Sequence, residues 1–290
     1  WEVQDNKLTL SIKTTEDKYP LAVDPTLSFT APGLSNGGVL IQGDASTKFG
    51  VFLSVGDLNA DGKTDLVVGA NTYSTSTGRV YIFYNDGNYS GRANGADVVI
   101  TGEGTSNYFG RAFIAGDVNA DGKDDLVVGA YSGAGGGRTY IFYNDSFYPT
   151  AAASADVIIT GETSSGFGGW AFVVADFNAD GEKDIAVGAY NYSTTTGRVY
   201  LFYADGTSNF GTATCSGTPA VCSAANADVI ITGEATTNYF STALTAGDFN
   251  ADGKVDLAVG AYSYSSNTGR AYIFYNGSII TEAATGADVI

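Results

Sequence analysis

The chain has 290 residues, of which 44% are hydrophobic and 16% charged, which predicts a folded chain with a sizeable core. Its net charge of −17, with only 14 scattered lysines and arginines, argues against nucleic-acid binding, because a polyphosphate requires a basic surface. No apolar run approaches the ~18 residues of a membrane-spanning helix, so no span is expected in this segment.

The first 37 residues are predicted to form a short β segment or the tail of a preceding domain. KLTLSIKT (7–14) alternates apolar and polar residues, as a strand with one buried face does. YPLAVDPTLSF (19–29) contains two prolines and is predicted to be extended. A lone strand, GVLIQGD (38–44), is then expected to open the repeat region.

Residues 38–290 contain four repeats. The first aspartate of an acidic loop recurs at positions 57, 117, 176 and 248, so the spacings are 60, 59 and 72 residues. The long third interval contains an insertion at about residues 205–226. A period of this length indicates a repeat array or a propeller. The expected blades are roughly 45–103, 104–162, 163–234 and 235–290.

Each repeat predicts four short strands, and no segment has a helical period. In the second repeat the strands are RAFIAGD (111–117), DLVVGAY (125–131), GRTYIFYN (137–144) and ADVIITGE (155–162). The third strand is apolar on both faces: in the first repeat Val80 and Ile82 alternate with Tyr81 and Phe83. A small sheet that is covered on both faces is typical of stacked propeller blades, so the predicted class is an all-β propeller.

The acidic loops follow the pattern D-x-N-x-D-G-x-x-D. An EF-hand is excluded, because its twelfth position requires a glutamate and here is a valine within a strand. The loops could be Asx-rich turns without metal, but three carboxylates within nine residues repel one another unless a cation neutralises them. Four Ca²⁺ ions would add eight positive charges and change the net charge from −17 to −9.

We therefore predict one Ca²⁺ in each loop, bound through oxygen atoms. The predicted side-chain ligands are Asp57, Asn59, Asp61 and Asp65; Asp117, Asn119, Asp121 and Asp125; Asp176, Asn178, Asp180 and Asp184; and Asp248, Asn250, Asp252 and Asp256. The predicted backbone carbonyl ligands belong to Lys63, Lys123, Glu182 and Lys254.

The loop and its flanks resemble a known repeat. Phe49-Gly50, the acidic loop and Gly69-Ala70 are similar to the FG-GAP repeat of integrin α-chain propellers and microbial surface proteins, and the resemblance covers about residues 39–290. It implies a calcium-bearing β-propeller, typically seven-bladed, with each ion in the hairpin between the first two strands of a blade. The sequence departs from that pattern where Phe240-Ser241 replaces Phe-Gly, where Phe167-Gly168 lies one residue farther from its loop, and where Asn or Tyr replaces the proline.

The insertion carries the only two cysteines, Cys215 and Cys222. They are either free thiols or a disulfide; we expect a disulfide, at the outer edge of the third blade, in an oxidising extracellular compartment. Candidate N-glycosylation sequons, which fit the same location, begin at Asn88, Asn144, Asn191 and Asn276.

An arginine opens each third strand and an acid follows each fourth strand. Antiparallel neighbours predict pairs within a blade: Arg79 with Glu103, Arg138 with Glu162, and Arg198 with Glu234. Arg270 and Asp44 would then lack partners, which predicts a longer surface protein or a polymer. Tyrosines crowd the turn after the second strand, either as a ligand-binding ring or as rim packing: Tyr73, Tyr131, Tyr190, Tyr192, Tyr262 and Tyr264.

These features predict an extracellular, calcium-stabilised structural or adhesion module at the cell surface, with protein ligands, glycan ligands or copies of itself as partners. The alternative is a carbohydrate-binding or carbohydrate-processing propeller. Catalysis is not expected, because histidine is absent and the acids outside the loops recur once per repeat instead of forming one unlike pair.

Overall fold

The computed structural model describes residues 39–290 except 134, 146, 205–214, 216 and 278, together with the backbone of β1 (Glu2–Gln4) and β2 (Lys7–Thr9). These two strands pair antiparallel, so the start of the predicted strand at 7–14 is a strand. Its remainder and the segment 19–29 lie outside the described residues.

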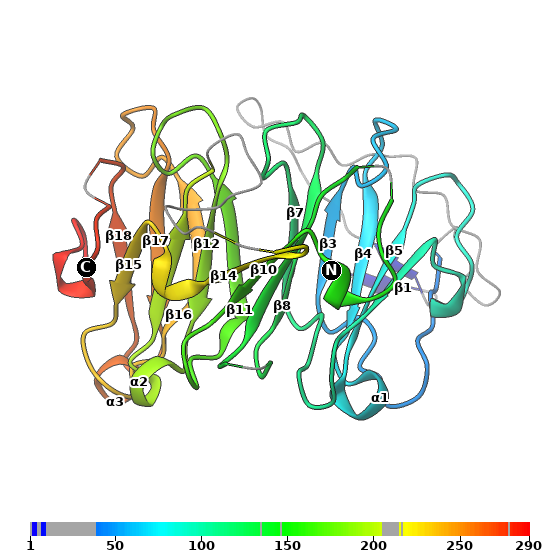
Figure 1. Cartoon of the computed structure of the whole chain (residues 1–290), viewed down its shortest axis with the longest axis horizontal. Coiled ribbons are helices and arrows are strands. Elements are labelled where there is room, and N and C mark those ends of the chain that lie inside the picture. The colour runs from blue at the N-terminus through cyan, green and yellow to red at the C-terminus, as the bar shows by residue number, and fades with distance from the viewer. Residues whose placement is uncertain are drawn as a thin grey trace.

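Four antiparallel sheets lie side by side, from the first repeat at the right of Figure 1 to the fourth at the left. Blade 1 contains β3 (Leu53–Gly56), β4 (Asp65–Ala70), β5 (Arg79–Phe83) and β6 (Val98–Thr101). Blade 2 contains β7 (Phe113–Gly116), β8 (Asp125–Ala130), β9 (Arg138–Phe142) and β10 (Val157–Thr160). Blade 3 contains β11 (Phe167–Ala175), β12 (Asp184–Ala189), β13 (Arg198–Phe202) and β15 (Val229–Thr232). Blade 4 contains β16 (Phe240–Gly247), β17 (Asp256–Ala261) and β18 (Arg270–Phe274).

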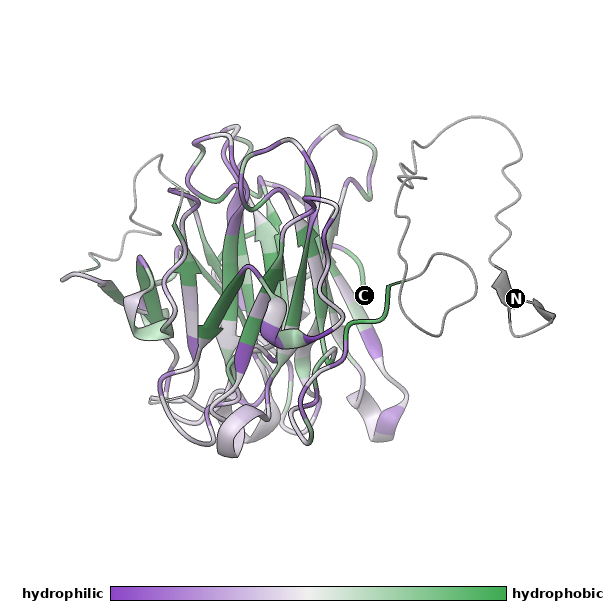
Figure 2. Cartoon of the chain, turned by 90° about the vertical axis from the view of Figure 1, so that its right-hand side faces the viewer, coloured by the Kyte–Doolittle hydropathy of each residue, from purple (hydrophilic) through white to green (hydrophobic). Residues whose placement is uncertain are grey.

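The core lies between the blades, as the apolar faces of the third strands predict. Val80 and Ile82 are buried in a cluster with residues of blade 2, whereas Tyr81 and Phe83 are buried in a separate cluster on the opposite face of blade 1. In Figure 2 the apolar residues follow the strands and the polar residues lie in the loops at both ends. The fold is a β-propeller architecture made of consecutive blades.

Register places two kinds of loop at opposite ends of each sheet. Each acidic loop joins the first two strands, and its ninth residue pairs with the end of the first strand, as Asp125 pairs with Gly116. The second strand then runs to the other end, where Ala130 pairs with Arg138 at the start of β9. The acidic hairpins therefore lie at one end of the stack and the polar turns at the other.

Three of the polar turns contain one turn of helix that the sequence did not predict: α1 (Tyr73–Ser76), α2 (Tyr192–Thr195) and α3 (Tyr264–Asn267). All three lie at the bottom of Figure 1. Each contains left-handed residues; in α1, φ is 45° at Ser74, 57° at Thr75 and 61° at Ser76. Side chains rarely adopt this conformation, so tertiary contacts must hold it.

Each blade also reaches back to the preceding blade. β14 (Ala220–Ser223) lies parallel to β10, and β19 (Glu282–Ala283) lies parallel to β15. Thr101 and Ala151 make the equivalent bridge between blades 1 and 2. A 3₁₀ turn follows each of these contacts, η2 (Ala152–Ser154), η3 (Ala224–Asn226) and η4 (Ala284–Gly286), and η1 (Ala93–Gly95) follows the bridge between Gln42 and Arg92. Backbone hydrogen bonds thus couple neighbouring blades.

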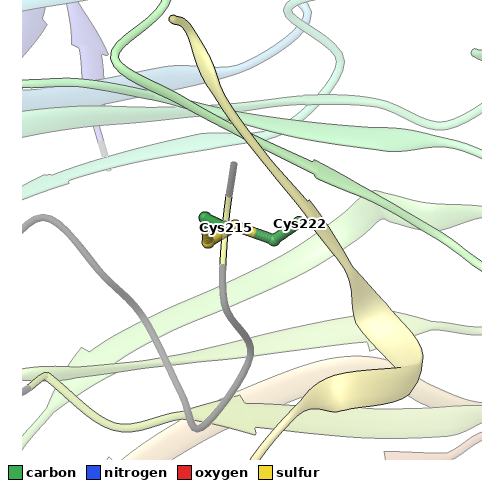
Figure 3. The surroundings of a disulfide bond; sticks show 2 residues. All are labelled: Cys215 and Cys222. Atoms are coloured by element: carbon green, nitrogen blue, oxygen red, sulfur yellow. A yellow bond between two sulfur atoms is a disulfide. The ribbon is translucent and has the colours of Figure 1, made fainter. Parts of the chain in front are cut away.

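Three predictions are corrected by this arrangement. The predicted fourth strand of blade 4 makes only an isolated bridge, between Ile273 and Val289. The described part of 38–44 makes only an isolated bridge, from Gln42 to Arg92, and is not a strand. The structure contains the Cys215–Cys222 disulfide (Figure 3), but Cys222 lies on β14, opposite Ile159 of β10. The cysteine segment therefore adds to the outer edge of the second sheet, not the third, because the connection reaches back one blade.

Candidate metal loops

The four acidic loops share one hydrogen-bond network. In the first loop the Asp57 carboxylate accepts hydrogen bonds from the backbone N–H of Asp61 at 3.1 Å and of Gly62 at 2.9 Å. The Asn59 side-chain oxygen also accepts from Asp61 N–H, at 3.0 Å, and Asp61 accepts from Lys63 N–H at 2.9 Å. The same four contacts recur in the loops that begin at Asp117, Asp176 and Asp248.

The ninth residue of each loop is an aspartate that is buried: Asp65, Asp125, Asp184 and Asp256. Asp125 accepts hydrogen bonds from the backbone N–H of Val118 at 3.0 Å and of Asn144 at 2.8 Å. The first donor belongs to the loop and the second follows the third strand of the blade. The aspartate therefore ties the loop to the sheet, and each carboxylate oxygen keeps a second lone pair.

The electrostatics of the loops indicate unneutralised charge. Burial, together with the neighbouring loop carboxylates, raises the pKa of Asp125 and of Asp184 to about 7, although backbone hydrogen bonds lower it. Burial raises the pKa of Asp65 in the same way. The nearby lysines contact the outer carboxylates instead: Lys63 Nζ lies 3.2 Å from Asp61. A cation bound in the loop would supply the missing positive charge.

The residues fit a hard cation in their chemistry. Each loop offers three carboxylates, one amide oxygen and the carbonyl at its seventh position, and Ca²⁺ prefers such oxygen donors. Among the described residues, no three acidic, histidine or cysteine side chains converge as a metal-binding group. In this structure the loop carboxylates are directed to backbone N–H groups, so the predicted ligands share a loop without forming a closed shell.

The arginine–acid pairs connect neighbouring blades, which corrects the predicted pairing within a blade. Arg138 contacts Glu103, Arg198 lies 3.0 Å from Glu162, and Arg270 lies 2.9 Å from Glu234. Arg198 does lie beside the end of its own fourth strand, where its Nε donates to Thr232 at 2.9 Å. The guanidinium, however, extends past that strand to the preceding blade, so Arg270 has a partner.

The tyrosines after the second strands divide into two groups. Those of the left-handed turns hold an arginine: the guanidinium carbon lies 3.6–3.7 Å from the ring centroid in Arg79–Tyr73, Arg198–Tyr192 and Arg270–Tyr264. The others stack on rings of the adjacent connection, as Tyr131 does on Tyr108 and Tyr262 does on Tyr239.

The candidate glycosylation sites differ in exposure. Asn88 and Asn191 are exposed, although the Asn191 amide also donates to the Ser164 carbonyl at 3.1 Å. Asn276 is partly buried and donates to Phe177 O at 2.7 Å. Asn144 is only 2% exposed and donates to Asp57 O, so its burial disfavours it as a glycan acceptor.

Two residues near the tyrosine turns were not singled out from the sequence. Trp170 is 45% exposed, and the guanidinium carbon of Arg111 lies 4.2 Å from its ring centroid. The available signal was a difference between repeats, since Arg111 and Trp170 occupy the same position, six residues before the first loop aspartate, where the other repeats have Val51 and Thr242.

Comparison with known families and proteins places these features among known repeats. The FG-GAP repeat family matches residues 49–83 and 240–274, and the FG-GAP-like repeat family matches residues 117–187. Phosphatidylinositol-glycan-specific phospholipase D of Rattus norvegicus is 34% identical over 157 residues, which cover 48% of this chain and 18% of that protein.

Integrin alpha-IIb of Homo sapiens is 33% identical over 166 residues, covering 53% of this chain and 15% of the integrin. Integrin alpha-PS2 of Drosophila melanogaster is 30% identical over 232 residues, covering 74% of this chain and 15% of the integrin. The chain thus spans less than a fifth of the length of these relatives. Among the described residues, no helix has the length and apolar character required to cross a membrane.

Proposed function

This chain is built from FG-GAP repeats that form β-propeller blades, and on that basis we propose that it is an extracellular, calcium-stabilised module with a structural or adhesive role. The observation that carries the proposal is the buried ninth aspartate, which recurs in four identical loops and ties each loop to its sheet. A Ca²⁺ ion in each loop would neutralise that carboxylate and stabilise the hairpin at the end of the blade.

The ligands of each ion would be the side chains at loop positions 1, 3, 5 and 9 and the carbonyl at position 7. In the second loop these are Asp117, Asn119, Asp121, Asp125 and the Lys123 carbonyl. Binding in the range of extracellular calcium modules, Kd ~10⁻⁴ to 10⁻³ M, would add ~1.4 kcal/mol per site at tenfold excess. Four sites together would supply a large part of the stability of a typical domain.

The extracellular location is supported by two features. The Cys215–Cys222 disulfide is characteristic of oxidising compartments. Extracellular calcium is also abundant enough to fill weak loops of this kind. Asn88 and Asn191 are the sequons whose exposure suits a glycan.

We propose a binding role and not a catalytic one, although the relatives include a phospholipase as well as integrins. The match to the phospholipase covers only 18% of that enzyme and is confined to part of the repeats here. The acids that follow the fourth strands, Glu103, Glu162 and Glu234, are each paired with an arginine in equivalent surroundings. Equivalent environments do not separate an acid from a base.

Open apolar faces support a larger assembly as the working form. Val173 and Leu201 of blade 3 are buried against blade 4, whereas Ala243 and Ala271, on the corresponding face of blade 4, are exposed. At the other end of the stack, Leu53 and Val55 are 59% and 60% exposed. Further blades or a second copy would cover such faces. Sedimentation in calcium tests this, and a monodisperse 29.9 kDa monomer would contradict it.

The calcium role is tested by thermal unfolding of the same sample in EDTA and after calcium is restored. We expect chelation to lower the Tm and calcium to restore it. Asp125→Asn should reduce the calcium-dependent gain, and Asp86→Asn, at an exposed aspartate outside the loops, should preserve it. An unchanged Tm on chelation would refute the role.

A further inference from the structure

The junction of blades 2 and 3, on the face opposite the acidic loops, differs from the equivalent junctions of the other repeats. Between β8 and β9 the turn is SGAGGG (132–137), one residue shorter than the turns of the other blades, such as SYSSNTG (263–269). It lacks the tyrosine that stacks on an arginine in those turns. Gly135 and Gly136 have positive φ in this turn, where the other turns contain left-handed serine and threonine residues, and Gly137 corresponds to Gly78, Gly197 and Gly269.

This shorter turn leaves a hollow of about 370 Å³. Tyr131 and Tyr190 stand on its walls, and Thr163, Ser164 and Asn191 supply hydroxyl and amide groups. The glycine turn packs directly on the neighbouring connection: a Cβ on Gly136 would stand 1.8 Å from the Glu162 carbonyl oxygen. The hollow is therefore lined by a glycine turn that the other blades lack and by tyrosines that recur after the second strands.

Aromatic rings extend from the hollow in both directions. Tyr108 stacks on Tyr131 at 4.9 Å, and Tyr190 contacts Trp170 at 5.5 Å edge to face. Arg111 joins the two sides, because its guanidinium carbon lies 4.2 Å from the Trp170 centroid and 5.4 Å from that of Tyr131. Such a partly exposed row of rings with polar groups between them is typical of a ligand surface and not of a core.

The charge of this surface differs from that of the whole chain. Three acids of this face, Glu103, Glu162 and Glu234, are paired with arginines. Arg111 makes no ion pair within the described part of the chain. The loop aspartates lie at the opposite ends of the strands. The junction thus presents a cation without an acidic partner, beside acids that are paired with arginines.

We propose that the junction of blades 2 and 3 binds an acidic carbohydrate. Pyranose rings would pack their C–H faces on Tyr131, Trp170 and Tyr190, because aromatic faces attract polarised C–H groups. Sugar hydroxyls would bond to the hydroxyl and amide groups of the hollow, and a sugar carboxylate would pair with the Arg111 guanidinium. The inference rests on the proposed adhesive role and names the ligand class of that role.

The test uses the 290-residue chain made without N-glycans, since a glycan on Asn191 would stand at the rim of the hollow. Trp1→Phe leaves Trp170 as the sole tryptophan, so its emission reports binding. The probes are a hyaluronan tetrasaccharide and the same tetrasaccharide with methyl-esterified carboxyls. We expect saturable binding of the acid, weakened about tenfold by esterification or by Arg111→Gln. Lys48→Gln, which removes an exposed charge from the same face of blade 1, should leave binding unchanged.

A second variant fills the hollow. Replacing residues 132–137 by the SYSSNTG turn of blade 4 should abolish binding measured by calorimetry while the Tm is maintained. No binding of the tetrasaccharide, equal binding of its ester, or tighter binding of an oligoproline peptide would overturn the proposal. Calcium-dependent stability is measured on the same samples, so a failure of the calcium role and a failure of the sugar site are distinguished.

Discussion

The contact between Arg198 and Glu162 predicts that stability is coupled across blades and not within them. One guanidinium nitrogen lies 3.1 and 3.0 Å from the two Glu162 oxygens, and both side chains are partly buried. Such a pair contributes about 1 kcal/mol after screening by solvent. Arg198 also donates to Thr232 and stacks on Tyr192 at 3.7 Å, which adds about 1 and 0.5–1 kcal/mol respectively.

Arg198→Ala should therefore destabilise the protein by about 2.5 kcal/mol, or lower the Tm by roughly 5–10 °C. A double-mutant cycle separates the partners, with unfolding followed at fixed calcium in Arg198→Ala, Glu162→Gln, Glu234→Gln and the corresponding double variants. We expect a coupling energy of about 1 kcal/mol with Glu162 and none beyond error with Glu234, which pairs with Arg270. Coupling to Glu234 without coupling to Glu162 would refute the pairing across blades.

Three further predictions concern protonation, the disulfide and a buried amide. In EDTA, lowering the pH from 8 to 5.5 should raise the Tm. The reason is that the folded pKa of Asp125 and of Asp184, about 7, exceeds the unfolded value of about 3.9. The contribution of these two groups to stability is therefore full below pH ~4 and is lost as the pH rises through 7. Saturating calcium should remove this gain. A Tm in EDTA that falls when the pH is lowered from 8 to 5.5 would contradict the prediction. Reduction of Cys215–Cys222 should cost about 2.5 kcal/mol for so short a loop, and an unchanged Tm in reductant would argue against that. Asn144→Ala should cost about 1–2 kcal/mol of stability, because Asn144 is buried and donates to the Asp57 carbonyl at 3.3 Å. The control Asn88→Ala, at an exposed asparagine, should be neutral. Equal stabilities of the two variants would refute the inter-blade contact.

The sequence predicted the blades well because strand patterns report burial directly. Alternation along GRVYIFYN requires two apolar faces, and the structure buries Val80 and Tyr81 in different clusters. The acidic hairpins could be predicted equally well, since their ends coincide with changes from polar to apolar residues.

The arginine pairing was wrong because strand register fixes which backbones are adjacent but not where a long side chain ends. Arg198 lies opposite Thr232 as expected, yet its guanidinium contacts the preceding blade. The left-handed turns were missed for a related reason. Serine and threonine disfavour positive φ, and the turn is held by contacts that no local pattern reveals, such as Thr77 Oγ1 to Ser74 O and the Arg79–Tyr73 stack.

Trp170 and Arg111 were missed because the predictions used only the residues that the repeats have in common. Residues common to every blade build the scaffold, so a site that occurs once must be sought where the repeats differ. Only the structure showed that Trp170, Arg111 and the glycine turn lie at one junction.

Anomalous diffraction from crystals grown in calcium chloride would show whether the acidic loops hold calcium. We expect an anomalous peak in each of the four loops, with the ninth aspartates (Asp65, Asp125, Asp184 and Asp256) among the ligands at ~2.4 Å. Loops that show no anomalous peak, and whose first aspartates still accept hydrogen bonds from the backbone N–H groups, would contradict it.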